Sequence, residues 1–321
     1  MKIIISGATG FIGKNLVEKI SKIKKFKIIC LVRKTSNKKD IEFLKKHNMK
    51  IIYGDITKKK EINSLKNEFD NSDIIIHLAG ILGKFNIKKK EYHKINVIGT
   101  KNLIDMCKKQ KFIYCSTAGV LGKIENGNEK SKPSPTNIYE KSKLEGEKIV
   151  KKYNNYVILR PGLIYGKYDK HLLPLFNSIK EKKFFLLGNG NSKIQPTYVD
   201  DLINCLIYSV NKKIKNQYYL ITGEKPITIK YFTLTIAKCC KVNLNKIKIP
   251  LFVAKLYVIL TERICQKLKI NQILTKSRLD FFTISRTFNN EKAKKELNFK
   301  PNNFEIGFKK TINWYMKKKL L

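Results

Sequence analysis

The stretch KIIISGATGFIGKNL, residues 2–16, joins an apolar run to three glycines, Gly7, Gly10 and Gly13, spaced three apart. The run predicts a buried strand, and the apolar period after it predicts a helix over 11–22. The first glycine permits a tight bend, the second lets backbone approach a pyrophosphate, and the third lets helix and sheet pack closely. The unpaired N–H groups and partial positive charge at the helix start suit phosphates. The stretch therefore predicts a dinucleotide-binding strand–turn–helix unit.

Apolar runs and helical patterns continue to alternate through the first half of the chain. Runs that are apolar on both faces and separated by helices are typical of a parallel sheet covered on both sides. The predicted fold class is therefore α/β, with a doubly wound parallel (Rossmann) sheet. The predicted strands cover 2–6, 27–32, 50–54, 73–80, 111–116 and 156–161, and the predicted helices cover 11–22, 61–68, 91–109 and 137–152.

The second half has a looser pattern, and the apolar run at 216–222 predicts a strand that returns to the main sheet. We expect an NAD(P)-binding domain made of residues 1–165 plus about 197–222. A smaller, interleaved α+β substrate lobe is expected from about 166–196 and 223–321. The helices predicted here cover 171–181, 200–210, 228–239, 250–268 and 303–317.

The apolar stretch PLFVAKLYVIL, from Pro250 to Leu260, is interrupted by Lys255 and is too short to span a bilayer. We expect a buried helix here, and a helix for a membrane surface or an apolar substrate is the alternative. The chain is therefore predicted to have no integral membrane segment, while peripheral membrane contact stays open.

The net charge of +42 raises the question of a nucleic-acid partner, but only five of the 67 basic residues are arginines. Nucleic-acid readers rely on the bidentate arginine fork. We interpret the scattered lysines as compositional bias and expect no nucleic-acid partner; attraction to anionic membranes is the weaker alternative. The seven cysteines form no C-x-x-C pair and the N-terminus is already a strand, so we expect reduced thiols and a cytoplasmic location.

The end of the second predicted strand bears on the choice of cofactor. A carboxylate there would accept hydrogen bonds from the ribose 2′-hydroxyl of NAD(H). The chain instead has Val32 followed by Arg33 and Lys34, two cations that suit a 2′-phosphate. We therefore favour NADP(H), with NAD(H) as the alternative.

A second motif, YEKSK, places Tyr139 and Lys143 four residues apart on one helix face. A nearby ammonium is expected to lower the phenol pKa, which would let the tyrosine exchange a proton near neutral pH. Two other Tyr–Lys pairs have the same spacing, Tyr208–Lys212 and Tyr315–Lys319, so spacing alone is not decisive. The first pair follows a strand end, CSTAGVLG, that supplies hydroxyls, and ligands bind at such ends.

The ordered set of motifs resembles the extended short-chain dehydrogenase/reductase family, of the NAD-dependent epimerase/dehydratase type. The residues of these motifs are most similar to those of the 3β-hydroxysteroid-dehydrogenase-like and dihydroflavonol-reductase-like branch. The family resemblance also suggests a homodimer. The motifs are SGATGFIG, GDIT with Asp55, HLAG at 77–80, NVIGT from Asn96, STAGVLG from Ser116, YEKSK, LRPGLIYG, PTYVDDL and FNNEKAKKELNFKP.

The resemblance implies a role for each matching residue. Tyr139 would be the acid/base, Lys143 would lower its pKa and hold the nicotinamide ribose, and Thr117 would bind the reacting oxygen. His77 is expected to be a satisfied core histidine, and no metal site is predicted. The cofactor-binding residues implied are Gly7, Thr9, Gly10, Phe11, Ile12, Gly13, Arg33, Asp55, Ile56, Ala79, Gly80, Asn96, Tyr139 and Lys143.

Three departures from the family pattern bear on the small-molecule substrate. Many nucleotide-sugar enzymes of the family have an asparagine and an arginine where this chain has Leu163 and Ile194, although Lys193 lies next to the second position. Leu121 replaces a usual tyrosine, which is expected to widen the site.

Three functions therefore stay open. The first is an oxidoreductase that transfers hydride between NADP(H) and a secondary alcohol or ketone. The second is a nucleotide-sugar 4-epimerase or dehydratase that uses bound NAD(P). The third is a non-catalytic NADPH-binding subunit or assembly partner of a membrane respiratory complex.

Overall fold

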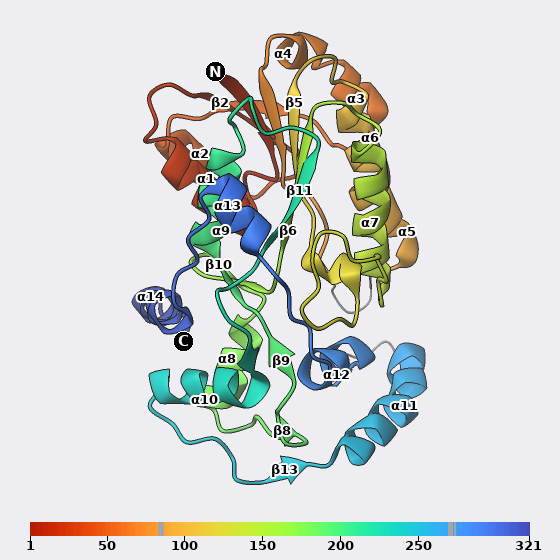
Figure 1. Cartoon of the computed structure of the whole chain (residues 1–321), viewed down its shortest axis with the longest axis vertical. Helices are drawn as coiled ribbons and strands as arrows, with labels where there is room; N and C mark the ends of the chain where they lie inside the picture. The colour runs from red at the N-terminus through yellow and green to blue at the C-terminus, as the bar shows by residue number, and fades with distance from the viewer. Residues whose placement is uncertain (83–86, 269–271, 273) are drawn as a thin grey trace.

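The computed structural model describes residues 1–82, 87–268, 272 and 274–321, without the side chains of residues 262, 263, 266 and 267. Its centre is a seven-stranded sheet in the order β11-β6-β5-β4-β1-β2-β3, and every pair of neighbours is parallel (Figure 1). The strands are β1 (Lys2–Ser6), β2 (Lys27–Val32), β3 (Lys50–Tyr53), β4 (Ile74–His77), β5 (Lys111–Cys115), β6 (Tyr156–Pro161) and β11 (Gln217–Ile221).

Helices cover both faces of this sheet, so the predicted doubly wound fold is confirmed. Alternate residues of β1 point to opposite faces: Ile3 and Ile5 belong to one buried cluster and Ile4 to the other. The first cluster includes side chains of α1 and α9, and the second includes side chains of α3, α6 and α7. These helices are α1 (Phe11–Ile20), α9 (Val199–Tyr208), α3 (Lys59–Asn63), α6 (Gly99–Ile104) and α7 (Ile138–Val150).

Several helix boundaries differ from the sequence-based prediction. The helix expected over 91–109 is three segments, in which one π-helical turn joins two α-helices. The helix α2 was missed because it is nine residues long and mostly charged. The helices α12 and α13 were also missed. These elements are α5 (Lys89–Tyr92), η1 (His93–Ile98), α2 (Lys38–Lys46), α12 (Lys276–Thr283) and α13 (Glu291–Leu297), with α4 (Lys66–Asp70) following α3.

The late strand returns to the sheet as predicted, because β11 pairs with β6 in parallel. The remaining elements gather mainly below the carboxyl ends of the strands in Figure 1. They are the helices α8 (Leu173–Lys180), α10 (Ile229–Cys239), α11 (Leu251–Leu268) and α14 (Phe304–Lys317), the short turn η2 (Ala118–Leu121) and the two-residue strands β7 (Ile164–Tyr165), β8 (Leu186–Leu187), β9 (Lys193–Ile194), β10 (Thr197–Tyr198), β12 (Ile227–Thr228) and β13 (Lys248–Ile249).

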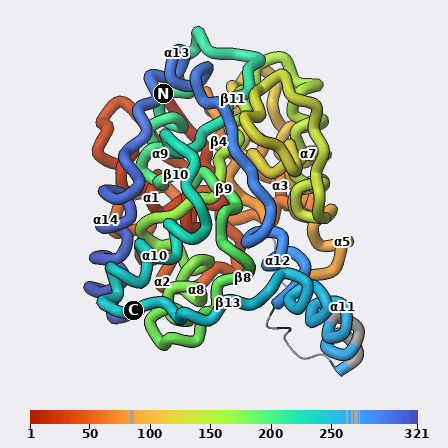
Figure 2. Tube along the Cα trace, turned by 60° about the horizontal axis from the view of Figure 1, so that its bottom comes forward, coloured from red at the N-terminus to blue at the C-terminus, as the bar shows by residue number. Residues whose placement is uncertain are grey.

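The prediction that the apolar helix near 250–268 is buried was wrong. Phe252 is 72% exposed and Ile259 is 67% exposed, whereas Ala254 and Val258 are buried. The sequence pattern could not reveal this, because the helix is apolar around much of its circumference and lies at the periphery of the molecule (Figures 1 and 2). Among the described residues, no helix is both long enough and apolar enough to cross a bilayer.

A buried ion pair ties α7 to the sheet. The Arg160 guanidinium of β6 donates to both carboxylate oxygens of Glu147 in α7, at 2.9 and 2.6 Å. The two side chains are 1% and 0% exposed. Tyr218 of β11 lies against the guanidinium, whose centre is 4.8 Å from the ring. The bidentate geometry fixes how α7, and with it the catalytic pair predicted on α7, sits on the sheet.

Candidate active site

A cavity of about 520 Å³ opens at the carboxyl ends of the central strands. This is the edge at which open α/β sheets bind ligands. The cavity brings together most of the predicted glycine turn and all three predicted catalytic residues. Of the predicted residues, those that line the cavity are Gly7, Gly10, Phe11, Ile12, Gly13, Gly80, Thr117, Tyr139 and Lys143.

The glycine turn has the geometry that the sequence predicts. Gly7 has φ of +76°, and a Cβ there would lie 2.5 Å from the Ala79 nitrogen. A Cβ on Gly13 would lie 2.2 Å from the Gly7 carbonyl oxygen. Gly10 caps α1 without any side-chain hydrogen bond, and the first turn of α1 has no acidic residue. The cradle therefore fits a dinucleotide pyrophosphate: the backbone can approach closely, and the helix start offers N–H donors and positive charge.

Tyr139 and Thr117 meet at the cavity wall, and the Thr117 hydroxyl lowers the phenol pKa. Burial is the larger cause and acts in the opposite direction, so the pKa of Tyr139 is raised above its ordinary value. The predicted lowering of this pKa by Lys143 stays a prediction, because burial sets the direction of the net shift. At neutral pH the phenol is protonated, and the upward shift makes it a weaker acid than a free tyrosine.

Lys143 is almost fully buried, at 5% exposure. Its Nζ donates to the Cys115 carbonyl oxygen at 2.7 Å and lies 4.1 Å from the centre of the Tyr114 ring. Burial lowers the pKa of Lys143 to about 8, while Cys115 and Glu147 act weakly in the other direction. The ammonium is therefore still charged at neutral pH, and the loss of its hydration on burial destabilises the fold.

We expect Lys143→Met to stabilise the fold at pH 7 by about 1–3 kcal/mol while abolishing turnover. Below pH 8 the folded and unfolded chains both hold this proton, so the whole penalty of burying the charge is present. Between pH 8 and the ordinary lysine value the unfolded chain binds more protons, so wild-type stability rises with pH. Urea unfolding at pH 7 and pH 10 measures the difference, which should shrink at the higher pH. Equal stabilities at pH 7 would contradict the prediction.

Asn96 supports the site and does not line the cavity. It is buried within η1; its Oδ1 accepts from the Ile81 N–H at 2.8 Å and its Nδ2 donates to the Ser142 hydroxyl at 2.9 Å. A Cβ on Gly80 would lie 3.1 Å from the same Oδ1. Asn96 therefore fixes the loop after β4 against the helix that carries Tyr139 and Lys143.

His77 is a satisfied core histidine, as predicted. It is fully buried; its Nδ1 lies 2.7 Å from the Ser6 hydroxyl and its Nε2 lies 3.0 Å from the Thr100 hydroxyl. Thr100 donates its own proton to the Asn96 carbonyl, so it accepts from Nε2. Burial lowers the pKa of His77 well below its ordinary value, so the ring stays neutral.

The other predicted cofactor residues lie outside the lining of the cavity. Arg33 is exposed at the end of β2, and its charge acts on Asp55. Burial raises the pKa of Asp55, but hydrogen bonds from Thr57 and the charge of Arg33 outweigh it, so the net shift is downward. Ile56 is buried against Gly99. Thr9 lies in the glycine turn and Ala79 in the loop after β4, next to residues that do line the cavity.

Sequence reasoning missed an arginine in the cavity wall. Arg286 donates to the Glu140 carboxylate at 2.5 Å and to the Thr136 hydroxyl at 2.8 Å. Glu140 follows Tyr139 directly and is 4% exposed. The scarcity of arginine in this chain was the available signal, since Arg286 is one of only five. Other lining residues that the sequence did not single out as site residues are Glu140, Leu78, Ile81, Leu82, Leu172, Gln195, Phe281 and Phe288.

Two of the three departures from the family pattern face the cavity. Leu163 and Ile194 both line it, so apolar side chains occupy the two positions that the sequence singled out. Leu121 is 1% exposed and packs with Val120, Leu220 and other buried residues. The expectation that Leu121 widens the site is therefore not met, because its side chain lies in the core.

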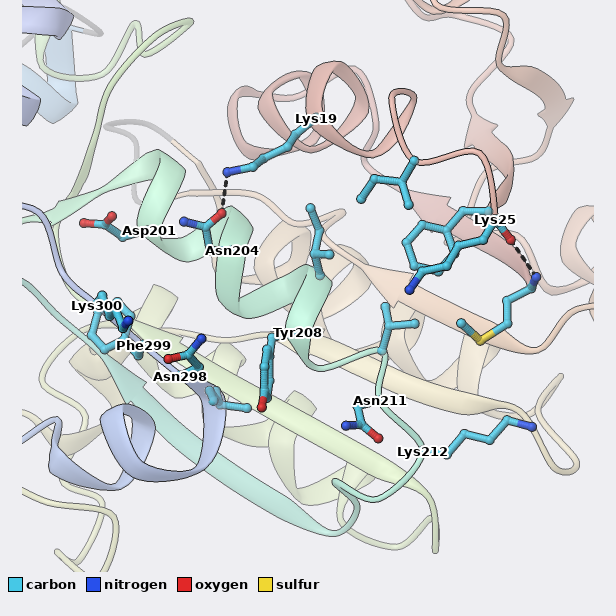
Figure 3. A pocket seen from close by; sticks show the side chains of 16 residues that line it. Lys19, Lys25, Asp201, Asn204, Tyr208, Asn211, Lys212, Asn298, Phe299 and Lys300 are labelled. Carbon is cyan, nitrogen blue, oxygen red and sulfur yellow. Dashed lines mark hydrogen bonds between the residues drawn. The ribbon is translucent and has the colours of Figure 1, made fainter.

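A second hollow of about 850 Å³ lies between α1 and α9, away from this chemistry. Figure 3 shows Lys19 hydrogen-bonded to Asn204 across it, with Lys25, Tyr208 and Lys300 around its rim. Asp201 is already held by Asn302. None of the predicted site residues lines it, so the smaller cavity at the strand ends is the candidate active site.

Comparison with known proteins places this geometry in a family. The model of the NAD dependent epimerase/dehydratase family matches residues 3–221. The chain is 27% identical to a decarboxylating sterol-4-alpha-carboxylate 3-dehydrogenase of Candida albicans, with 97% of each chain covered. It is 32% identical to a dTDP-D-glucose 4,6-dehydratase of Dictyostelium discoideum, over 69% of this chain and 58% of that one.

A solved structure with the same fold is UDP-glucuronic acid 4-epimerase from Bacillus cereus in complex with NAD. It superposes with a TM-score of 0.78 over 99% of both chains, at 21% identity. The likeness extends over the lower part of the molecule as well as the sheet, since nearly the whole chain is covered.

Proposed function

This chain belongs to the NAD-dependent epimerase/dehydratase family of enzymes, and we propose that it is an oxidoreductase that interconverts an apolar secondary alcohol and its ketone with NADP(H). The observation that supports this best is the composition of the cavity. Beside Tyr139 and Thr117, its wall is apolar at Leu163, Ile194 and Phe281. The resemblance to a sterol 3-dehydrogenase over nearly its whole length points to the same substrate class.

The residues of the chain divide the chemistry among them. The nicotinamide cofactor, when bound in the glycine cradle, supplies or accepts the hydride. Tyr139 donates its phenolic proton to the carbonyl oxygen as the carbonyl carbon is reduced, and takes a proton back in the reverse direction. Thr117 hydrogen-bonds the same oxygen and orients it. Lys143 places a positive charge beside the site and lies next to Gly80, where a ribose hydroxyl can be held.

Turnover of added cofactor tests the proposal. The purified enzyme is mixed with NADPH and a panel of apolar cyclic ketones, and absorbance at the reduced-nicotinamide band is followed. We expect steady-state consumption of NADPH with at least one apolar ketone and none with UDP-sugars or dTDP-glucose. Absence of turnover across the panel would refute the assignment.

A nucleotide-sugar 4-epimerase or dehydratase is the second candidate. The 32% identical relative is named as a dTDP-D-glucose 4,6-dehydratase, and Arg286, which is paired with Glu140, places a guanidinium in the cavity wall. This function requires cofactor that stays bound through turnover, with conversion of a sugar nucleotide and no net NADPH consumption. Mass analysis of the purified protein and product chromatography separate the two candidates.

The preference for NADP(H) rests on Arg33, and we expect Arg33→Ala to weaken NADPH binding by tenfold or more while changing NADH binding less than twofold. An exposed guanidinium at the end of β2 can form a charge-assisted pair with a 2′-phosphate, and a neutral 2′-hydroxyl offers no such charge. Titration calorimetry with both cofactors measures the difference. Lys39→Ala is the control, because that exposed cation lies on α2, beyond the strand end. Equal losses for the two cofactors would contradict the NADP(H) assignment.

Three further expectations stay predictions. They are the division into a cofactor domain and a substrate lobe, the homodimer, and the cytoplasmic location. Limited proteolysis, light scattering and fractionation of cells test them in turn.

A further inference from the structure

The helix α11 exposes more apolar surface than a helix packed in a protein core. Along its length Phe252, Leu256 and Leu260 are 72%, 54% and 57% exposed, and Ile247 just before it is 69% exposed. Further exposed apolar side chains on α11 are Leu251, Val253, Tyr257, Ile259, Ile264 and Leu268. A contiguous apolar patch of this kind on a folded protein marks an interaction site.

The buried side of the helix explains its orientation. Ala254 and Val258 pack with Leu279 of α12 and Leu187 of β8. At 100° per residue these two positions lie opposite Phe252 and Leu256, so the exposed side chains form one face that points away from the protein. Figures 1 and 2 show α11 at the edge of the molecule, with α12 beside it.

Cations border this apolar face. Lys246 and Lys248 are exposed just before α11, Lys255 is exposed on it, and Lys276 is exposed at the start of α12. Residues 246–282 include only two acidic residues, Glu262 and Asp280, and the Asp280 side chain is half-buried. An apolar face edged by lysines is the pattern of a helix that lies in the interface of an anionic membrane.

We propose that α11 docks this enzyme onto the surface of an anionic lipid bilayer. The exposed apolar side chains enter the boundary between headgroups and acyl chains, and the lysines contact the anionic headgroups. A second copy of the chain fits this face less well, because pairing two such faces would bring two sets of lysines together in addition to the overall charge of +42.

The placement of α11 also connects the membrane surface with the cavity. On α12, Leu279 and Phe282 pack toward the α11 cluster while the neighbouring Phe281 lines the cavity. A docked α11 would therefore hold the cavity close to the bilayer, where an apolar alcohol or ketone partitions. This consequence rests on the proposed function, but docking itself does not, and the test below uses no substrate.

Binding of the full chain to vesicles tests the proposal. Vesicles of phosphatidylcholine with 30% phosphatidylglycerol are compared with pure phosphatidylcholine by flotation. We expect at least tenfold tighter binding to the anionic vesicles, and a tenfold or greater loss in Phe252→Gln/Ile259→Gln. The matched control, Leu234→Gln/Ile306→Gln, changes side chains that are 45% and 53% exposed on α10 and α14, and it should bind like wild type.

Two lysine variants separate docking through α11 from attraction by net charge. Lys246→Gln/Lys248→Gln/Lys255→Gln should lose at least fivefold in affinity for the anionic vesicles. Lys212→Gln/Lys213→Gln/Lys215→Gln removes the same charge from another exposed segment and should lose less than twofold. Equal losses in the two triple variants, or no vesicle binding at all, would overturn the proposal.

A depth measurement keeps the proposal testable if binding is weak. In Phe252→Trp, the tryptophan emission should shift to shorter wavelength with anionic vesicles, and brominated acyl chains should quench it. Both changes should exceed those of wild type, whose single tryptophan is Trp314. Light scattering of wild type and the α11 double variant is run alongside. A wild-type dimer that the double variant abolishes, without the fluorescence shift, would assign the face to a second copy instead.

Discussion

Replacing Tyr139 with phenylalanine is expected to lower kcat by about 10²–10⁴-fold, the usual contribution of a general acid. In the proposed reaction the phenol is the proton donor, and it lies in the cavity wall with Thr117. The ring itself is retained, so packing of α7 and binding of NADPH should change less than twofold. Stopped-flow kinetics with an accepted ketone measures kcat, and fluorescence titration measures cofactor binding.

Tyr208→Phe is the matched control for this variant. Tyr208 also precedes a lysine by four residues, but it lies at the end of α9, is 41% exposed and borders the other hollow. We expect its activity to equal that of wild type. Full activity in Tyr139→Phe would refute the proposed acid, and equal losses in both variants would show that the tyrosine spacing has no catalytic meaning here.

Glu147→Gln should lower the free energy of unfolding by about 3–5 kcal/mol. The change leaves the Arg160 guanidinium buried without its counter-charge, at 1% exposure. Urea unfolding followed by circular dichroism measures the loss. Activity should fall as well, since the ion pair fixes α7 against β6.

Two further variants separate a buried-charge effect from general disruption. Asp105→Asn removes the carboxylate of the Lys101–Asp105 pair, whose side chains are 53% and 34% exposed, and should cost about 0.5 kcal/mol or less. Glu147→Leu/Arg160→Met removes both buried charges and should be more stable than Glu147→Gln. A double variant as unstable as the single one would show that packing volume, not unpaired charge, causes the loss.

Much of the fold was predictable because it follows from local pattern. Each strand of the main sheet is a short apolar run, and the run ending at Ile221 was assigned to the sheet although it lies 56 residues beyond β6. The helix α2 was missed although Ile41, Phe43 and Leu44 give it an apolar side, because it is only nine residues long and its other six residues are charged. The long helix expected over 91–109 is divided by η1, where buried Asn96 bonds the loop after β4 and Ser142.

The candidate site divides in the same way. Gly7 and Gly13 were identifiable because only glycine meets their local requirements. Gly7 needs a positive φ, and Gly13 lies too close to the Gly7 carbonyl to carry a Cβ. The partner of Glu140 was not identifiable, because Arg286 lies 146 residues away in sequence. The position of Leu121 in the core, away from the cavity, likewise depends on packing against Leu220 and Phe288.

The sequence by itself determined the glycine cradle, the strands of the main sheet, and the placing of Tyr139 and Lys143 on one helix face. These features depend on periodicity and on backbone limits within a few residues. Only the tertiary structure decided the upward pKa shift of Tyr139, the lowered pKa of Lys143 and the exposure of α11. Desolvation is a property of what surrounds a group in space, and distant segments of the chain supply those surroundings.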